Sequence, residues 1–171
     1  MPDLVSSKVL ESIEIAHELY HQLVLLVGLV GSGKTKTLQD VAQKSSSQVF
    51  NVNLSLSAKL IELTAKQRAL RLQGLLDQIT SEAQSPLLLD NLEILFDKDL
   101  HQDPLKLLQG LSRNRTVVAS WNGTSKSGKL EYAVPGHPEY RCYETADLLM
   151  VNIDGTTSID LENNFREIGQ A

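Results

Sequence analysis

The sequence contains one cysteine, no long hydrophobic run and no excess of positive charge. These features argue against a disulfide-bonded protein, a membrane-spanning protein and a protein that binds nucleic acid by itself. Cys142 has no second cysteine to pair with, so an internal disulfide is excluded and a reducing cytoplasm is the expected compartment. No stretch reaches the roughly 18 apolar residues that a membrane span requires. The chain opens with Met-Pro-Asp, not with the basic and then apolar segments of a signal peptide. We therefore expect a cytoplasmic protein that does not enter a membrane.

The charge balance argues against one class of partner. Lysine and arginine number 16 against 21 aspartates and glutamates, which gives a formal net charge of −5. Proteins that hold nucleic-acid phosphates by themselves usually carry a basic surface. Direct nucleic-acid binding is therefore not expected of the isolated chain, although another subunit could supply it. The 171 residues, 42% of them hydrophobic, suit one globular domain with a substantial core.

Apolar runs that suit strands alternate with helical periodicities along the chain. A helix is predicted over residues 4–20, where apolar residues recur every three to five positions. Further helices are expected over 34–44, over about 57–79, and from Asp103 and Pro104 onward, where the aspartate caps the first turn and the proline opens it. Strands are expected at 23–27, 49–53, 87–90, 116–120 and 148–153, and residues 122–129 are expected to form a polar, Gly-rich loop.

This alternation predicts an α/β fold, a three-layer sandwich in which helices cover both faces of a mostly parallel, five-stranded sheet. One domain is expected over residues 1–171. It consists of an N-terminal helix within 1–22, a core over 23–153, and a short C-terminal hairpin or tail over 154–171 that begins at Asp154 and Gly155. Because only this tail follows the fifth strand, no C-terminal helical lid is expected.

The strand at 23–27 leads into the most specific motif of the chain. Residues 28–35 read Gly-Leu-Val-Gly-Ser-Gly-Lys-Thr and match the phosphate-loop pattern G-x-x-x-x-G-K-[ST]. In such a loop the glycines let the backbone wrap closely around a phosphate, and the N–H groups and the following helix bind the anion. We expect Lys34 to reach the β- and γ-phosphates of ATP and Thr35 to ligate Mg²⁺. The predicted nucleotide-binding residues are Gly28, Gly31, Ser32, Gly33, Lys34, Thr35 and Lys36.

Two acidic residues at the third predicted strand are candidates for metal and water chemistry. Leu-Leu-Leu-Asp at 87–90 resembles a Walker B strand, so Asp90 is expected to support the Mg²⁺. The position directly after Asp90, where many hydrolytic P-loop proteins carry the catalytic base, holds Asn91. Glu93 is therefore the candidate for polarising the attacking water. The alternative for Glu93 is a solvent-facing or helix-capping role.

Polar residues near the remaining strands are candidates for contacts with the γ-phosphate. Asn122 follows the fourth predicted strand, where ATPases with an extra strand between the two Walker strands carry a γ-phosphate sensor. Ser120 is the substitute candidate for this sensor. The alternative for Asn122 is an Asn-Gly turn without a nucleotide role. Arg141 lies shortly before the fifth strand, where AAA+-like ATPases carry an arginine finger that reaches a neighbour's nucleotide, and Arg113 and Arg115 are its rivals. The predicted catalytic residues are Lys34, Glu93, Asn122 and Arg141.

Three further segments suggest a family. They are Asp-Asn-Leu-Glu-Ile-Leu-Phe-Asp at 90–97, Leu-Ser-Arg-Asn-Arg-Thr at 111–116 and Pro-Gly-His-Pro-Glu-Tyr-Arg at 135–141. With the phosphate loop, they resemble BrxF, the small P-loop ATPases of BREX bacteriophage-defence systems, over about residues 23 to 153. The resemblance implies ATP binding and hydrolysis within a multi-protein defence apparatus, with other BREX-type defence proteins as partners. Carried over by position, Lys34 and Thr35 contact phosphate and Mg²⁺, and Asp90 supports the metal.

The sequence leaves other functions open. Without a lid, the nucleotide site is expected to be completed by a second copy of the chain or by a partner, so a homo-oligomer is expected. A small-molecule kinase is one alternative, in which Lys126 and Lys129 of the Gly-rich loop would serve as the mobile basic lid that such kinases need. A nucleotide-binding scaffold that does not hydrolyse ATP is another, favoured if Glu93 is not the base. A GTPase is not expected, because the guanine-binding N-K-x-D sequence is absent.

Overall fold

The computed structural model describes residues 2–157, so residues 158–171 of the predicted tail lie outside the described part. The sheet has seven strands, with β2, β3, β4, β1 and β7 side by side in that order and with β5 and β6 attached to β4. The strands along this path pair in parallel: β1 (Leu23–Gly28), β2 (Val49–Asn51), β3 (Leu87–Asp90), β4 (Val117–Lys126) and β7 (Leu149–Asn152). They correspond to the five predicted strands, except that β2 ends at Asn51 and residues 52–53 begin a helix, and the predicted α/β fold is confirmed.

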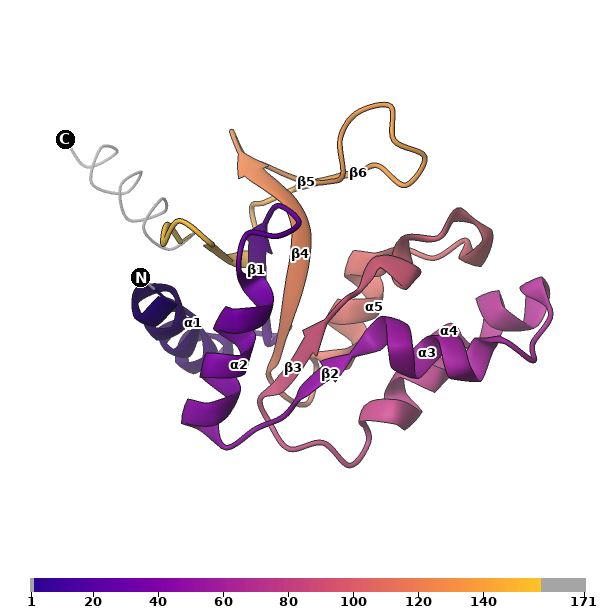
Figure 1. Cartoon of the computed structure of the whole chain (residues 1–171), viewed down its shortest axis with the longest axis horizontal. Coiled ribbons are helices and arrows are strands. Elements are labelled where there is room, and N and C mark those ends of the chain that lie inside the picture. The colour runs from indigo at the N-terminus through magenta and orange to yellow at the C-terminus, as the bar shows by residue number, and fades with distance from the viewer. Residues whose placement is uncertain (1, 158–171) are drawn as a thin grey trace.

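Helices cover both faces of this sheet (Figure 1). Helices α1 (Pro2–Ala16) and α2 (Lys34–Ser45) lie on one face. Helices α3 (Val52–Leu60), α4 (Ala65–Thr80) and α5 (Pro104–Leu111) lie on the other, together with two short 3-10 helices, η1 (Glu93–Phe96) and η2 (Lys98–Leu100). None of the helices within residues 2–157 is both long and apolar enough to cross a membrane.

The two faces of the sheet bury alternate residues of each central strand. Along β1, Val24 and Leu26 pack against α1 and α2, whereas Leu25 and Val27 belong to the core beneath α3, α4 and α5. Successive side chains of a strand point to opposite faces, so a strand covered on both sides must be apolar throughout. This explains why the central strands appear in the sequence as unbroken hydrophobic runs.

Two helix predictions need correction. The first helix ends at Ala16 and not at residue 20, because the chain turns before it enters β1, and Tyr20 is 71% exposed there. The predicted helix over 57–79 is two helices, because the chain turns at residues 61–64. Thr64 begins α4 with a capping box, in which its hydroxyl accepts from the N–H of Gln67 and the side chain of Gln67 accepts from the N–H of Thr64.

The predicted loop over 122–129 is also wrong. Strand β4 continues to Lys126, turns at Ser127 and Gly128, and pairs antiparallel with β5 (Lys129–Tyr132), which in turn pairs with β6 (Arg141–Glu144). Gly123 permits this pairing, because a Cβ there would lie 1.7 Å from the carbonyl oxygen of Glu131. The hairpin of β5 and β6 rises above the carboxyl edge of the parallel sheet (Figure 1).

An aromatic cluster fastens this hairpin to the rest of the domain. Tyr132 of β5 stacks on Phe96 of η1 with ring centroids 3.4 Å apart and planes 8° from parallel. Trp121 of β4 packs edge-on against both rings, and its indole N–H donates to the carbonyl of Glu131 at 3.1 Å. On β6, the hydroxyl of Tyr143 donates to the carboxylate of Asp103 at 2.9 Å. The hairpin therefore has a defined position relative to η1 and α5.

The last described residues turn back on β7. The N–H of Gly155 donates to the carbonyl of Asn152, and Thr157 forms an antiparallel bridge with Val151. This turn at Asp154 and Gly155 begins where the hairpin was predicted. The remainder of the predicted tail lies beyond residue 157.

Candidate functional site

The phosphate loop joins β1 to α2 at the carboxyl edge of the sheet. Gly31 and Gly33 have φ angles of 78° and 100°, in the left-handed region that side chains disfavour. Gly28 is closely packed, since a Cβ there would lie 2.5 Å from the hydroxyl oxygen of Ser32 and 3.2 Å from the side chain of Ile153. Gly33 caps α2 without a side-chain hydrogen bond, so the first N–H groups of the helix remain available to an anion.

The side chain of Lys34 is folded into this loop. Its ammonium donates to the carbonyl oxygens of Gly28 at 2.8 Å and Leu29 at 2.7 Å, and the residue is 6% exposed. Burial lowers the pKa of the Lys34 ammonium, while the nearby carboxylates of Asp90 and Glu93 act in the opposite direction. A buried cation inside a ring of backbone groups is suited to bind a phosphate.

Thr35 and Asp90 meet at the end of the loop. The Thr35 hydroxyl donates to Oδ2 of Asp90 at 2.6 Å, and the Ser120 hydroxyl donates to Oδ1 at 2.7 Å. Asp90 is only 5% exposed, so its carboxylate is solvated mainly by these two hydroxyls. Hydroxyl and carboxylate oxygens are the ligands that Mg²⁺ prefers, so the donor set fits that ion.

Glu93 lies beside this group at the start of η1. Its Oε1 accepts from the amide of Asn122 at 2.7 Å, and its Oε2 accepts from the amide of Asn53 at 2.7 Å. The amide oxygen of Asn53 also accepts from the N–H of Ile94 at 2.8 Å. Both carboxylate oxygens of the candidate base therefore accept from asparagine side chains, one that follows β2 and one in β4, the two strands on either side of β3.

Sequence reasoning missed Asn53. It lies at the start of α3, directly after β2, and parallel strands end at the same edge of a sheet. A polar residue at the carboxyl end of a predicted parallel strand was therefore the available signal. Asn122 was identified, but it does not end its strand. It lies within β4 two residues after Ser120, so the two side chains share one face and contact Glu93 and Asp90 respectively.

The three candidate arginines lie outside this cluster. Arg141 begins β6 opposite Tyr132, and its guanidinium donates to the carbonyl of Tyr140 at 3.4 Å. Arg115 is held by the end of α4, where it donates to the carbonyl and hydroxyl oxygens of Thr80. Arg113 lies 5.6 Å over the ring of Tyr20. Arg115 thus has a structural role that occupies its guanidinium.

Lys36 lies in the first turn of α2 and its side chain is exposed. It does not take part in the hydrogen bonds that Asp90 accepts from Thr35 and Ser120 or in those that Glu93 accepts from Asn122 and Asn53. Of the predicted binding residues, the structure therefore brings together the loop glycines, Ser32, Lys34 and Thr35, with Asp90 beside them.

Two cavities flank Glu93 at this edge. One, of about 690 Å³, lies toward α3 and is lined by Asn53, Leu54 and Ile94 among others. The second, of about 540 Å³, lies between the phosphate loop and the loop of the β5–β6 hairpin, and its lining includes Asn122. Glu93 and Glu139 line both, whereas lysine and arginine line neither.

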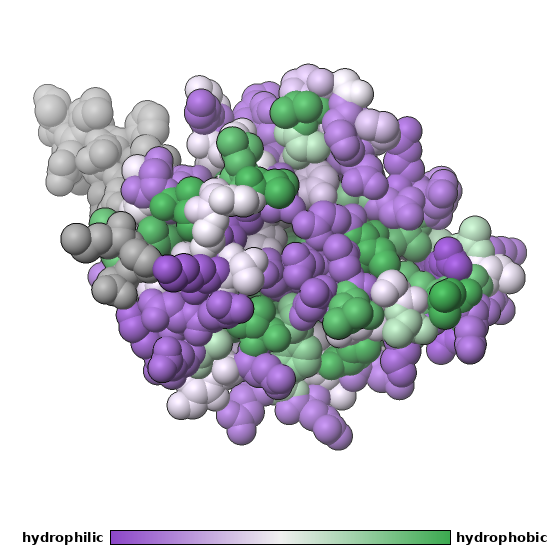
Figure 2. Space-filling view, viewed as in Figure 1, coloured by the Kyte–Doolittle hydropathy of each residue, from purple (hydrophilic) through white to green (hydrophobic). Residues whose placement is uncertain are grey.

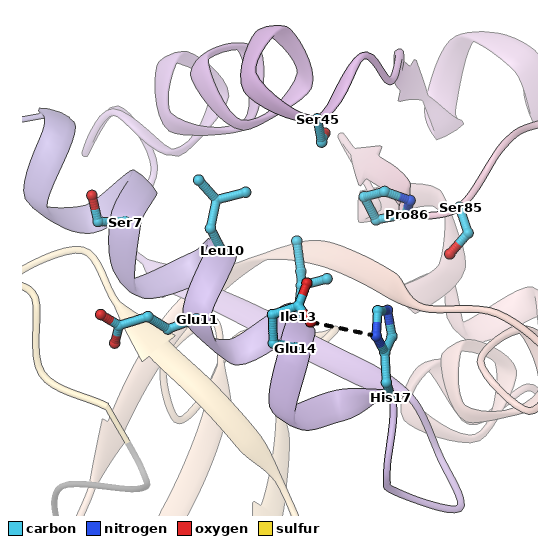
Figure 3. Close-up of a pocket in the computed structure, with 9 residues that line it drawn as sticks. All are labelled: Ser7, Leu10, Glu11, Ile13, Glu14, His17, Ser45, Ser85 and Pro86. Atoms are coloured by element: carbon cyan, nitrogen blue, oxygen red, sulfur yellow. Dashed lines mark ion pairs between the residues drawn. The ribbon is translucent and has the colours of Figure 1, made fainter.

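A third cavity, of about 700 Å³, is separate from this site (Figure 3). Helix α1 forms one wall, with Leu10, Glu11 and Glu14, and Pro86 at the start of β3 lies across from it. His17 is 3.9 Å from Glu14 there. None of the phosphate-loop residues lines this cavity, so it is not the candidate nucleotide site.

Together, the order of the strands and the junction of Lys34, Thr35 and Asp90 define a P-loop NTPase with an extra strand, β4, between the two Walker strands. The family model described as "ATPase family associated with various cellular activities (AAA)" matches residues 24–120, more than half of the chain. The chain therefore belongs to the AAA family. Membership implies nucleotide use, usually with Mg²⁺, and suggests ATPase activity in general.

Comparison with solved structures finds similarity to the structure of C. elegans PCH-2. The TM-score is 0.39 and the identity is 20%, over 74% of this chain and 37% of that chain. This chain thus spans little more than a third of the PCH-2 chain. A comparison with curated proteins gave no match.

Proposed function

We propose that the chain binds ATP with Mg²⁺ at the phosphate loop and hydrolyses it. The observation that carries the proposal is the 2.6 Å hydrogen bond from Thr35 to Asp90, because it joins the phosphate loop to the Walker B strand. These two residues would hold Mg²⁺, which neutralises phosphate charge when bound. Lys34 would exchange its bonds to the carbonyls of Gly28 and Leu29 for bonds to phosphate oxygens.

The proposed base is Glu93. Its carboxylate accepts from Asn122 at the edge of the sheet where β3 ends at Asp90, and two cavities open beside it. There it would accept a hydrogen bond from the attacking water and orient it. Phosphate release measured with Mg²⁺ and with a chelator tests this function, and release that is absent under both conditions would contradict hydrolysis.

A nucleotide-binding scaffold is the second candidate, and one observation favours it. Both oxygens of Glu93 already accept a hydrogen bond from an asparagine amide, which makes the carboxylate a weaker acceptor for a water molecule than an unpaired carboxylate would be. A chain that binds ATP tightly without releasing phosphate, alone or with added phosphate acceptors, would be such a scaffold. Phosphate transferred to an acceptor and not to water would instead indicate a small-molecule kinase.

The site is proposed to be completed by assembly, either with another copy of the chain or with a partner. The cavities beside Glu93 have no lysine or arginine in their linings, although a γ-phosphate in transfer is usually stabilised by a cation from that side. Arg141, on the exposed hairpin, is the proposed source of that cation. Apolar side chains exposed on and between α3 and α4 are available for protein contacts, notably Leu54, Ile61 and Leu70. Figure 2 shows hydrophobic patches among polar side chains on the side where these helices lie.

Specific activity measured against protein concentration, together with mass by light scattering, tests the assembly proposal. Turnover per chain should rise as the chains associate. Mixing Arg141→Ala chains with Lys34→Ala chains adds a complementation test, since the intact phosphate loop of an Arg141→Ala chain could then receive Arg141 from a neighbouring Lys34→Ala chain. High and constant activity per chain in a monomeric sample would contradict assembly as a requirement.

The biological setting is proposed from the resemblance to BrxF. The supporting segments are the phosphate loop and residues 90–97, 111–116 and 135–141. They suggest action in the cytoplasm with other BREX-type proteins that distinguish and block phage DNA. Genes for a methyltransferase and a large ATPase beside the gene for this chain would support the proposal, and their absence would count against it.

A further inference from the structure

The loop between β5 and β6 forms one wall of the 540 Å³ cavity beside the phosphate loop. Leu29 and Val30 of the phosphate loop also line this cavity, together with Glu93 and Asn122. The hairpin loop contributes Val134, His137 and Glu139. Histidine is the only lining residue that can carry a positive charge, while two of the others are carboxylates. Among the lining residues of the loop between β5 and β6, only His137 has a side chain that can donate a hydrogen bond to a phosphate group at the mouth of this cavity.

The loop holds its shape through its own hydrogen bonds. The N–H of His137 donates to the carbonyl of Val134 at 3.0 Å, and the N–H of Tyr140 donates to the carbonyl of His137 at 3.1 Å. Gly136 takes a φ of 93°, which suits glycine, and the base of the hairpin is fastened by the Phe96–Tyr132 stack. The imidazole therefore projects from a turn of fixed geometry.

The structure shows the hydrogen-bonding role of one ring nitrogen of His137. Nδ1 of His137 accepts from the backbone N–H of Glu139 at 3.0 Å. The neutral ring must then carry its proton on Nε2, which is left as a donor on the far side of the ring. A donor at Nε2 is present whether the imidazole is neutral or protonated.

We propose that His137 is a catalytic residue that donates a hydrogen bond from Nε2 to the terminal phosphate of a bound nucleoside triphosphate, on the side opposite the phosphate loop. The inference deepens the proposed ATP-binding function and rests on it. In the nucleotide-free arrangement the amide of Asn122 is engaged by Glu93, so His137 supplies a γ-phosphate donor that does not compete with that contact. The hydrogen bond would let the site distinguish ATP from ADP, because only the triphosphate has the terminal phosphate that accepts from His137.

Two substitutions separate this role from a role in shaping the loop. In His137→Asn, the side-chain oxygen replaces Nδ1 as acceptor for Glu139, but the donor at Nε2 is lost. In His137→Gln, the amide nitrogen reaches the place of Nε2, but the acceptor for Glu139 is lost. The affinities of ATP and ADP, each with Mg²⁺, are measured by calorimetry for both variants and for wild type. His17→Asn, at the opposite edge of the sheet (Figure 3), is the control.

The expected result for His137→Asn is ATP affinity weakened roughly tenfold, with ADP affinity unchanged, as for the loss of one hydrogen bond to a charged group. His137→Gln should retain more of the preference for ATP, and a loss of ATP affinity alone in both variants also supports the contact. Wild-type behaviour of His137→Asn would overturn the proposal, as would equal weakening of ATP and ADP. If wild type binds neither nucleotide, the proposed function itself fails.

Discussion

The amide of Asn122 donates to Oε1 of Glu93 at 2.7 Å, so the candidate γ-phosphate sensor and the candidate base are partners in this structure. Asn53 holds the other oxygen of Glu93 at the same distance. A nucleotide that draws Asn122 toward its γ-phosphate would release one carboxylate oxygen for a water molecule. The arrangement therefore links the occupancy of the site to the availability of the base.

Replacing the base tests this arrangement first. Glu93→Gln should keep ATP affinity close to that of wild type, because the carboxylate does not lie in the phosphate loop. Its phosphate release should fall by about 10²- to 10⁴-fold, the usual contribution of a general base. Glu82→Gln, an exposed substitution just before β3 at the other edge of the sheet, is the control. Full turnover by Glu93→Gln would remove this residue from catalysis and leave Glu62 or a partner residue as the base.

Asn53 is predicted to act by positioning Glu93. Asn53→Ala removes the bond to Oε2 and leaves the N–H of Ile94 without that acceptor, so kcat should fall roughly five- to tenfold while KM for ATP is unchanged. Asn51→Ala is the matched control, because the Asn51 side chain caps α3 by accepting from the N–H of Leu54 and does not bond Glu93, although it lines the same cavity. That variant should lose about 1 kcal/mol of stability and keep its kcat. Equal loss of kcat in the two variants would indicate a general structural effect.

Lys34 is expected to contribute to nucleotide binding and not to the stability of the nucleotide-free protein. Burial lowers its pKa, so the folded protein holds a disfavoured charge at neutral pH, and this penalty is relieved only as pH rises toward the ordinary pKa of lysine. Lys34→Met should therefore melt no lower than wild type without nucleotide, while losing the rise in melting temperature that Mg²⁺·ATP gives to wild type. A variant that melts well below wild type would show that its backbone hydrogen bonds outweigh the cost of burial.

Two tyrosines of the β5–β6 hairpin, Tyr132 and Tyr143, should make the protein less stable at high pH. Burial raises the pKa of Tyr132, and burial with the hydrogen bond to Asp103 raises the pKa of Tyr143. The neutral forms are thus favoured in the folded state, so their stabilisation is present below the ordinary tyrosine pKa of about 10 and is lost above it. Denaturant unfolding between about pH 9 and pH 11.5 should show this decline, and it should be shallower in Tyr143→Phe. An identical decline in wild type and variant would contradict the assignment.

The sequence allowed the parallel core to be predicted because its strands are covered on both faces. Such strands must be apolar throughout, as Leu87 to Leu89 are, and the phosphate-loop pattern marks where β1 passes into α2. The motifs also predict the roles of Thr35 and Asp90, although the contact between them is visible only in the structure. These features depend on local sequence, which is why they could be recognised without coordinates.

The antiparallel hairpin and the contacts of Glu93 could not be predicted in the same way. Residues 122–129 are polar and rich in turn-forming types, yet they pair as strands because Gly123 lets β4 approach the carbonyl of Glu131. Leu130 and Tyr132, buried at alternate positions, were the available signal for β5. The bond from Asn53 joins residues 40 positions apart, and only the parallel order of β2 and β3 brings them together.

The central claim is that Lys34, Thr35 and Asp90 form a site for Mg²⁺·ATP. The most direct measurement is a calorimetric titration of Mg²⁺·ATP into wild type and Lys34→Ala, with thermal melting to show that both are folded. The account predicts saturable binding to wild type and affinity weakened roughly ten- to a hundredfold in Lys34→Ala, as expected for the loss of a charge-assisted hydrogen bond. Equal affinity in the two folded proteins, or no binding to wild type, would contradict it.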